Sequence, residues 1–265
     1  MKKTSDIVRQ AGVLVLALLA IAAAAVGSGA FGGTPTSEAA DGALSATATP
    51  LAPAAAAFSI WSVIYLGLIA YAVWQLLPAQ RTNERQRQMG WLAAASMVLN
   101  AAWLLVVQVG ILWLSVVVIV VLLGVLVQIL LVLLRTSSGS LVERVVVDGT
   151  FGLYLGWVTI ATIANIVAAL TATDVGDLVL GATGWSVVLL VAAAAIGVAF
   201  AVSTGGRITP SLALAWGLAW VAVGRWSGEP ENATVAVAAA IAAVLTLGAG
   251  VVMALRTRAG TPSRA

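Results

Sequence analysis

Apolar residues gather in eight segments along the chain, separated by polar and turn-forming residues. The segments cover about residues 11–31, 57–77, 90–108, 112–134, 147–170, 180–203, 208–224 and 233–255. Most have the length of roughly 20 residues that a helix needs to cross about 30 Å of hydrocarbon. The pattern therefore predicts an all-α polytopic membrane protein with eight transmembrane helices. Segment 208–224 is short and contains Pro210, so a re-entrant helix is an alternative there.

The first apolar segment has two interpretations. Lys2, Lys3 and Arg9 precede it and small residues follow near Gly27, as in a secretory signal peptide. The apolar run is longer than a usual signal-peptide core, which favours a retained helix. The next stretch, 32–56, is rich in Ala, Thr, Pro and Gly and predicts a flexible external loop without a core of its own.

Basic residues divide unequally between the two sides of the predicted helices. With a cytoplasmic N-terminus, every lysine and arginine except Arg225 falls on the cytoplasmic side. These residues are Lys2, Lys3, Arg9, Arg81, Arg85, Arg87, Arg135, Arg144, Arg207, Arg256, Arg258 and Arg264. The outer side receives Glu38, Asp41, Asp174, Asp177, Glu229 and Glu231. The positive-inside rule predicts a multi-pass protein of a bacterial-type inner membrane with both termini in the cytoplasm.

Composition excludes several functions. Hydrophobic residues make up 62% of the chain and charged residues 9%, which no soluble domain of this length shows. The absence of Cys and His excludes disulfides, thiolate or imidazole metal sites and Ser-His or Cys-His nucleophiles. The basic residues are scattered rather than clustered, so we expect no nucleic-acid partner in spite of the net charge of +3.

No charged residue lies in the middle of a predicted helix. Ion-coupled transporters normally place one there, although it costs about 2.5–3.5 kcal/mol on insertion scales. Asp148 lies near the cytoplasmic end of the fifth helix, where we expect it to be solvated or paired with Arg144. The pattern argues against a proton-driven pump and against carboxylate catalysis in the membrane, so an enzyme is not the favoured class.

Tryptophan is abundant, with 10 residues. Most of them fit the aromatic belts at the two membrane surfaces. The belt residues are Trp74, Trp91, Trp113, Trp185 and Trp226, with Trp61 close to the outer edge. Trp103, Trp157 and Trp216 instead lie toward the middle of their helices, where they either pack in the core or line a cavity.

Two of these interior tryptophans share a helix face with an asparagine. Asn100 and Trp103 are three residues apart, and the stripe Tyr154, Trp157, Ala161 and Asn165 has spacings of three, four and four. A buried amide needs hydrogen bonds. The asparagines therefore either join helices or serve as polar groups in an aromatic-lined ligand cavity.

The same residues resemble the TspO/MBR family, the tryptophan-rich sensory proteins related to the mitochondrial translocator protein. The run Phe58-Ser59-Ile60-Trp61-Ser62-Val63-Ile64-Tyr65 is similar to the family's second-helix signature. Asn100-Ala101-Ala102-Trp103 is similar to the third-helix motif, and the stripe from Tyr154 to Asn165 to the fifth-helix pattern.

The resemblance implies a five-helix bundle that binds flat hydrophobic ligands, porphyrins and other tetrapyrroles in bacteria, under the first loop. The implied ligand-binding residues are Trp61, Tyr65, Asn100, Trp103, Tyr154, Trp157, Ala161 and Asn165. No obligatory cofactor is implied, and a bound porphyrin would be held by shape because the chain has no His or Cys ligand.

The chain departs from the family in its first loop and at its C-terminal end. Ala56 stands where the family usually has a loop Trp, which puts any degradative role in doubt, and the sterol-recognition pattern is absent after Asn165. We expect a cytoplasmic N-terminus at 1–9, a TspO-like bundle at 10–170, a three-helix extension at 171–255 and a cytoplasmic tail at 256–265. Trp216 and Trp220 of the extension share a face, for which packing is favoured over a cavity.

These observations predict an integral membrane protein that binds, senses or carries a hydrophobic small molecule, with a tetrapyrrole as the first candidate. Its partners would be this ligand and the lipid bilayer, and a homodimer is one assembly that the prediction allows. The alternatives are an uncoupled transporter of another neutral or amphipathic solute, an enzyme acting on a bound porphyrin, and a helical scaffold without a ligand.

Overall fold

The computed structural model describes residues 2–28, 34–36, 38–173 and 180–259. Asp174, Asp177 and Arg264, used above to predict topology, lie outside these residues. The chain forms two compact units. Unit 1 comprises Met1–Gly42 and Trp61–Phe151, and unit 2 comprises Ala43–Ile60 and Gly152–Ala265.

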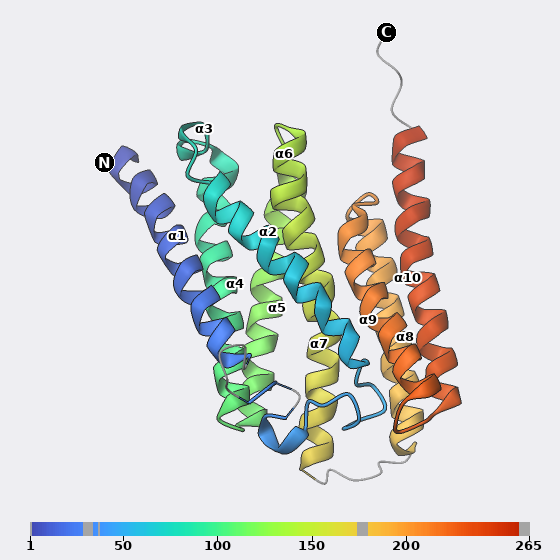
Figure 1. Cartoon of the computed structure of the whole chain (residues 1–265). Coiled ribbons are helices and arrows are strands. Elements are labelled where there is room, and N and C mark those ends of the chain that lie inside the picture. The colour runs from blue at the N-terminus through green and yellow to red at the C-terminus, as the bar shows by residue number, and fades with distance from the viewer. Residues whose placement is uncertain (1, 29–33, 37, 174–179, 260–265) are drawn as a thin grey trace. The chain divides into compact units, whose positions relative to one another are not determined.

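The all-α prediction is confirmed: in the described ranges the regular structure is helical, and all eight expected helices are present (Figure 1). They are α1 (Lys2–Gly27), α2 (Ile60–Trp74), α4 (Glu84–Gln108), α5 (Leu112–Arg135), α7 (Thr150–Ala172), α8 (Gly181–Ser203), α9 (Ile208–Ser227) and α10 (Ala233–Ala259). Short elements lie between them: η1 (Ala40–Gly42), η2 (Ala55–Ser59), α3 (Pro78–Arg81), α6 (Leu141–Glu143) and the π-helical turn η3 (Arg144–Gly149).

Two helices begin well before their apolar segments. α1 starts at Lys2 and α4 at Glu84, because backbone hydrogen bonds continue through polar residues that hydropathy does not count. Seven of the described helical segments are long and apolar enough to cross a membrane. α9 is a full helix of 20 residues but is not among the seven, since Pro210, Ser211, Arg225 and its tryptophans lower its hydropathy.

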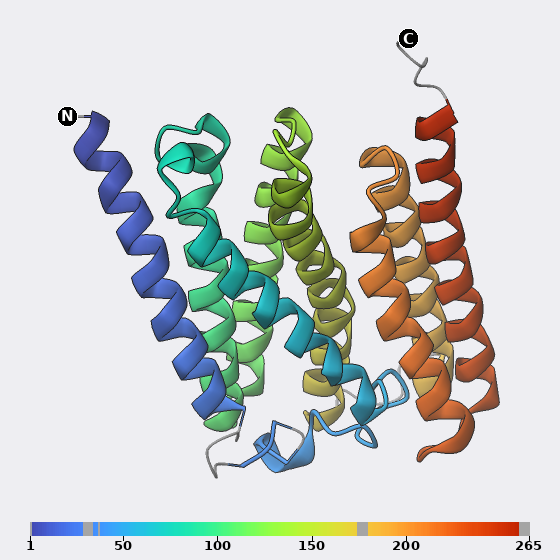
Figure 2. The same cartoon turned by 45° about the horizontal axis from the view of Figure 1, so that its top comes forward.

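In unit 1, small residues let neighbouring helices approach closely, as is common in membranes. α1 packs against α4, and α4 packs against α5, while α2 crosses them obliquely (Figure 2). A Cβ atom added to Gly12 of α1 would lie 2.7 Å from the Trp91 ring of α4. Gly67 of α2 likewise leaves no room for a side chain beside Thr150.

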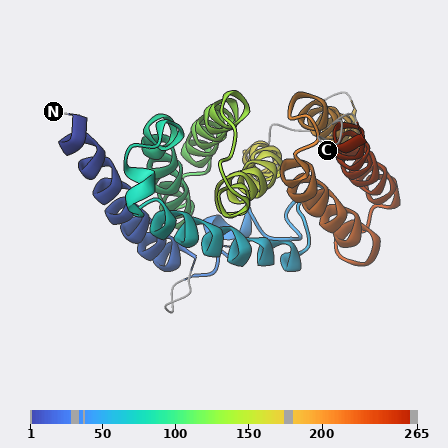
Figure 3. The same ribbon diagram turned by 90° about the horizontal axis from the view of Figure 1, so that it is seen from above.

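In unit 2, α8, α9 and α10 form a three-helix cluster, seen from above in Figure 3. Gly197 of α8 lies against Thr246 of α10, where an added Cβ would be 2.5 Å from the Thr246 side chain. α7 meets α9 in the same way, because Gly156 faces the Pro210 carbonyl and Gly217 faces Ile160. Of the last three helices, α9 is therefore packed directly on the helix that carries the predicted Tyr154–Asn165 stripe.

The prediction of a flexible loop without a core at 32–56 is wrong for residues 43–56. Leu51 is buried, and the Ala54 backbone N–H donates to the Trp220 carbonyl of α9 at 3.1 Å. The Arg225 side chain of α9 donates to the Ala46 and Thr49 carbonyls. The apolar pattern did not show this because the loop is held through its backbone carbonyl and N–H groups, which composition does not reveal.

Candidate functional site

The eight predicted ligand-binding residues are divided equally between the two units. Trp61, Tyr65, Asn100 and Trp103 belong to unit 1, whereas Tyr154, Trp157, Ala161 and Asn165 belong to unit 2.

In unit 1, Trp61, Tyr65 and Asn100 form a polar-aromatic cluster. Trp61 and Tyr65 are one turn apart on α2, and their rings stack with centroids 5.2 Å apart and an interplanar angle of 21°. Asn100 of α4 donates from Nδ2 to the Tyr65 hydroxyl at 2.9 Å. Trp103, three residues further along α4, is buried. The predicted Asn-Trp motif therefore lies beside a helix that presents two stacked rings.

The Asn100 amide is only half satisfied. Its side chain is buried, with the residue 3% exposed, yet Oδ1 has no hydrogen-bond partner among the residues that the structure describes. A buried acceptor without a partner costs about 1–3 kcal/mol, so such atoms are rare and often functional. Helix bridging uses only the Nδ2 group of Asn100 and leaves this oxygen unexplained.

In unit 2, Trp157 is the centre of a second aromatic group. Trp157 is 1% exposed. The ring of Phe58 in η2 contacts it edge-on, with ring centroids 5.6 Å apart and an interplanar angle of 80°. Tyr154 and Asn165 on the same helix are also buried, while Ala161 is half-buried. Phe58 was part of the sequence motif but was not predicted as a site residue.

Trp216 and Trp220 of α9 hold the segment that contains Phe58. Their rings are in edge contact, with centroids 5.6 Å apart, as expected from their shared face. The Trp216 Nε1 atom donates to the Ala57 carbonyl at 3.0 Å, next to Phe58. Trp220 accepts a hydrogen bond from the Ala54 backbone N–H, and Arg225 donates to the Ala46 carbonyl. Residues on successive turns of α9 therefore form hydrogen bonds along residues 46–57. This packing role agrees with the favoured interpretation of the pair.

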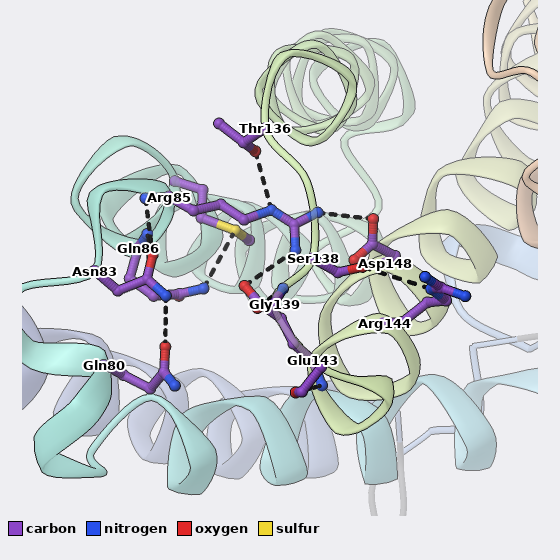
Figure 4. A network of polar contacts seen from close by, with 12 residues as sticks. Gln80, Asn83, Arg85, Gln86, Thr136, Ser138, Gly139, Glu143, Arg144 and Asp148 are labelled. Carbon is purple, nitrogen blue, oxygen red and sulfur yellow. Dashed lines mark hydrogen bonds and ion pairs between the residues drawn. The ribbon is translucent and has the colours of Figure 1, made fainter. Parts of the chain in front are cut away.

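A buried ionic network occupies one end of unit 1, and sequence analysis did not predict it. Arg85 is 3% exposed and donates from Nη1 to Glu143 Oε1 at 3.1 Å, from Nη2 to Asp148 Oδ1 at 2.7 Å and from Nε to Thr136 Oγ1 at 3.0 Å (Figure 4). Asn83 caps α4 and accepts from the Arg85 backbone N–H, which fixes the start of the helix. The network joins α4 to the segment that leads into α7.

The predicted environment of Asp148 is wrong. Asp148 is largely shielded from solvent, with a side chain 10% exposed, and it pairs with Arg85. The π-helical turn explains why this was missed: its i→i+5 hydrogen bonds place Glu143 and Asp148 on one face, whereas an α-helix would separate residues at that spacing. Buried charge thus exists at a helix end rather than in the middle of a predicted helix.

A second ionic contact anchors α1 at the same end of unit 1. Arg87 forms a bidentate pair with Asp6, through Nε at 2.8 Å and Nη2 at 2.5 Å. Arg9 donates to the carbonyls of Gln80 and Arg81 in the turn before α4. Arginines that sequence analysis treated only as topology signals therefore also join α1 to the rest of unit 1.

The helices and their buried side chains are those of a polytopic membrane protein in which aromatic and amide groups are buried. Within the described part of the chain, no group of three or more Cys, His, Asp or Glu residues could hold a metal ion. The chain belongs to the TSPO-like protein family, whose family model matches residues 11–252. This confirms the resemblance, and the match also includes the three last helices, which the motifs alone did not cover. No curated protein and no solved structure matched the chain.

Proposed function

We propose that this membrane protein binds a flat hydrophobic molecule, with a tetrapyrrole as the first candidate, and senses or carries it. The observation that supports the proposal is the cluster of Trp61, Tyr65 and Asn100, in which two stacked rings lie beside a buried amide with an unused oxygen. A small-molecule site is usually lined by apolar and aromatic side chains with a small number of polar groups among them.

The aromatic residues suit a flat ligand. Stacking on indole and phenol rings is worth about 0.5–1.5 kcal/mol per pair beyond the burial of apolar area. The chain has no His or Cys, so neither imidazole nor thiolate can ligate a porphyrin metal. Affinity would come from shape, apolar burial and a few hydrogen bonds.

The orientation proposed for the protein is supported separately in each unit. In unit 1, Arg9, Arg85 and Arg87 lie at the end where α1 and α4 begin. In unit 2, Gly206 lies against Ala254 near the end of α10, so the turn before Arg207 and the basic end of α10 share one side. Both arrangements agree with cytoplasmic termini in a bacterial-type inner membrane.

A binding titration tests the proposal. The purified protein in nanodiscs is titrated with protoporphyrin IX, and binding is followed through the absorbance of the porphyrin, so that loss of a tryptophan does not change the readout. Trp61→Ala should weaken binding by about 1–2 kcal/mol. Trp113→Ala is the matched control, because Trp113 is 47% exposed. Equal losses from the two variants, or no saturable binding by a panel of tetrapyrroles, would contradict the proposal.

The same preparation separates a carrier from a sensor. Sealed vesicles that contain the protein are loaded with the porphyrin, and its release is compared with that from protein-free vesicles. Release that saturates and depends on Trp61 would indicate a carrier. Binding without release would indicate a sensor.

A further inference from the structure

We propose that α9 acts as a clasp that keeps residues 46–57 closed over Trp157 and thereby sets how fast a ligand enters and leaves. The inference rests on the proposed function, because it names the regulation of ligand exchange at the proposed site. Phe58, the residue after this segment, contacts the Trp157 ring edge-on. Three residues later the chain reaches Trp61 of the polar-aromatic cluster. The segment is therefore connected to both groups of aromatic residues, to one through a ring contact and to the other through the chain.

The clasp consists of hydrogen bonds between α9 and the backbone of the segment. They join Trp216 Nε1 to the Ala57 carbonyl at 3.0 Å, the Trp220 carbonyl to the Ala54 N–H at 3.1 Å, and Arg225 Nη2 to the Ala46 carbonyl at 2.6 Å. Backbone groups that are removed from water need such partners. In the closed position, α9 therefore supplies partners to backbone groups at both ends of the segment.

The segment has little secondary structure of its own to keep it in place. Residues 43–54 form turns, bends and irregular backbone, and η2 is a single short 3₁₀ helix, whose hydrogen-bond geometry is poorer than that of an α-helix. Segments of this kind open locally while the rest of a protein stays folded. One net hydrogen bond changes an equilibrium by about five- to tenfold, so the loss of one clasp bond should raise the open fraction measurably.

Gly224 lets α9 approach the middle of the segment closely enough for a direct test. A Cβ atom added to Gly224 would lie 3.6 Å from the Ala54 Cβ atom. The Cβ atoms of disulfide-bonded cysteines are about 3.5–4.5 Å apart. The chain has no native cysteine that could compete. Ala54→Cys/Gly224→Cys should therefore form a disulfide that locks the clasp.

A clasp and a ligand contact differ in their kinetics. If the ligand passes the segment only when the segment is open, the open fraction multiplies both the association and the dissociation rate constants. The dissociation constant Kd then changes little. A residue that contacts the ligand instead changes mainly the dissociation rate constant.

The experiment uses the full chain in nanodiscs, with protoporphyrin IX as the probe and stopped-flow absorbance as the readout. Mass spectrometry confirms the disulfide in Ala54→Cys/Gly224→Cys. In the oxidised variant, we expect both rate constants to fall by about tenfold or more, with Kd within about twofold of its value in the reduced variant. The reduced form of the same variant is the matched control, because it carries the same side chains without the bond.

A second variant changes the clasp in the opposite direction. Trp216→Phe removes the Nε1–H donor to Ala57 and keeps an aromatic ring beside Trp220. Both rate constants should rise by about fivefold, the effect of one net hydrogen bond. Trp185→Phe on α8 is the control, because Trp185 is 39% exposed, and it should change neither rate constant.

The outcomes separate this inference from the proposed function. Saturable binding with equal rate constants in the oxidised and reduced variants would overturn the clasp and leave the proposed function intact. A rise in the dissociation rate constant alone in Trp216→Phe would also overturn it, because Trp216 would then be a ligand contact. Failure of the two cysteines to cross-link would contradict the close approach of α9 to Ala54. Absence of porphyrin binding by the wild-type protein would overturn the proposed function and the inference together.

Discussion

The Arg85 guanidinium donates to Asp148 Oδ1 at 2.7 Å and joins the first turn of α4 to the π-helical turn before α7. Both groups are shielded from water, so each depends on the other for its stabilisation. Removing one member of a buried pair leaves an uncompensated charge, which is costlier than replacing both.

Arg85→Met should therefore destabilise the protein by about 3–5 kcal/mol, because Glu143 and Asp148 would both lose their cation. The midpoint of unfolding in a detergent titration measures the effect. Arg135→Met is the matched control, since Arg135 is an exposed arginine at the end of α5. If both variants unfold at the same midpoint, the network does not stabilise unit 1.

The helices were predictable from sequence because burial in lipid requires long apolar runs, and each such run became a helix. The stripe from Tyr154 to Asn165 was predictable from helical spacing alone, whereas Trp61 and Tyr65 were implied only by the family resemblance. The Arg85 network could not be predicted from sequence, because the π-helical turn changes which residues face one another. The position of residues 43–56 could not be predicted either, because the Arg225 side chain donates to backbone carbonyls that no sequence pattern marks.

Trp157→Ala should weaken tetrapyrrole binding by about 1–3 kcal/mol, because it removes a buried ring that also positions Phe58. Affinity is measured by absorbance titration, only in preparations that retain the wild-type helix content. Trp113→Ala, at an exposed position of α5, should leave affinity nearly unchanged. Matching losses would indicate that these tryptophans serve general stability, and that the Trp157–Phe58 group of unit 2 does not bind a tetrapyrrole.

Cysteine labelling tests the proposed topology and the role of α9, and no native cysteine competes. With a membrane-impermeant maleimide, Glu229→Cys should be labelled in intact cells, whereas Thr82→Cys and Ser203→Cys should react only after lysis. Ser203 and Glu229 flank α9, so opposite accessibility is expected of a helix that crosses the membrane. Labelling of both from the same side would identify α9 as re-entrant.

The last prediction concerns Arg225, the one basic residue placed outside by the sequence pattern. It is 1% exposed, and its guanidinium donates to the carbonyls of Ala46, Thr49 and Pro230. Because these bonds tie residues 46–49 to α9, Arg225→Met should free this segment and remove the partners of three carbonyls. We expect faster amide hydrogen exchange in residues 43–54, by about tenfold or more.

Arg256→Met is the matched control for this exchange experiment, because Arg256 is exposed near the end of α10 and should not affect residues 43–54. The Trp216 hydrogen bond to Ala57 remains in Arg225→Met, so protection should be lost around Ala46 and Thr49 and kept near Phe58. This gradient is the specific signature of a segment held at separate points by α9. Uniform loss of protection throughout unit 2 would instead mean that Arg225 supports the fold of α9 itself.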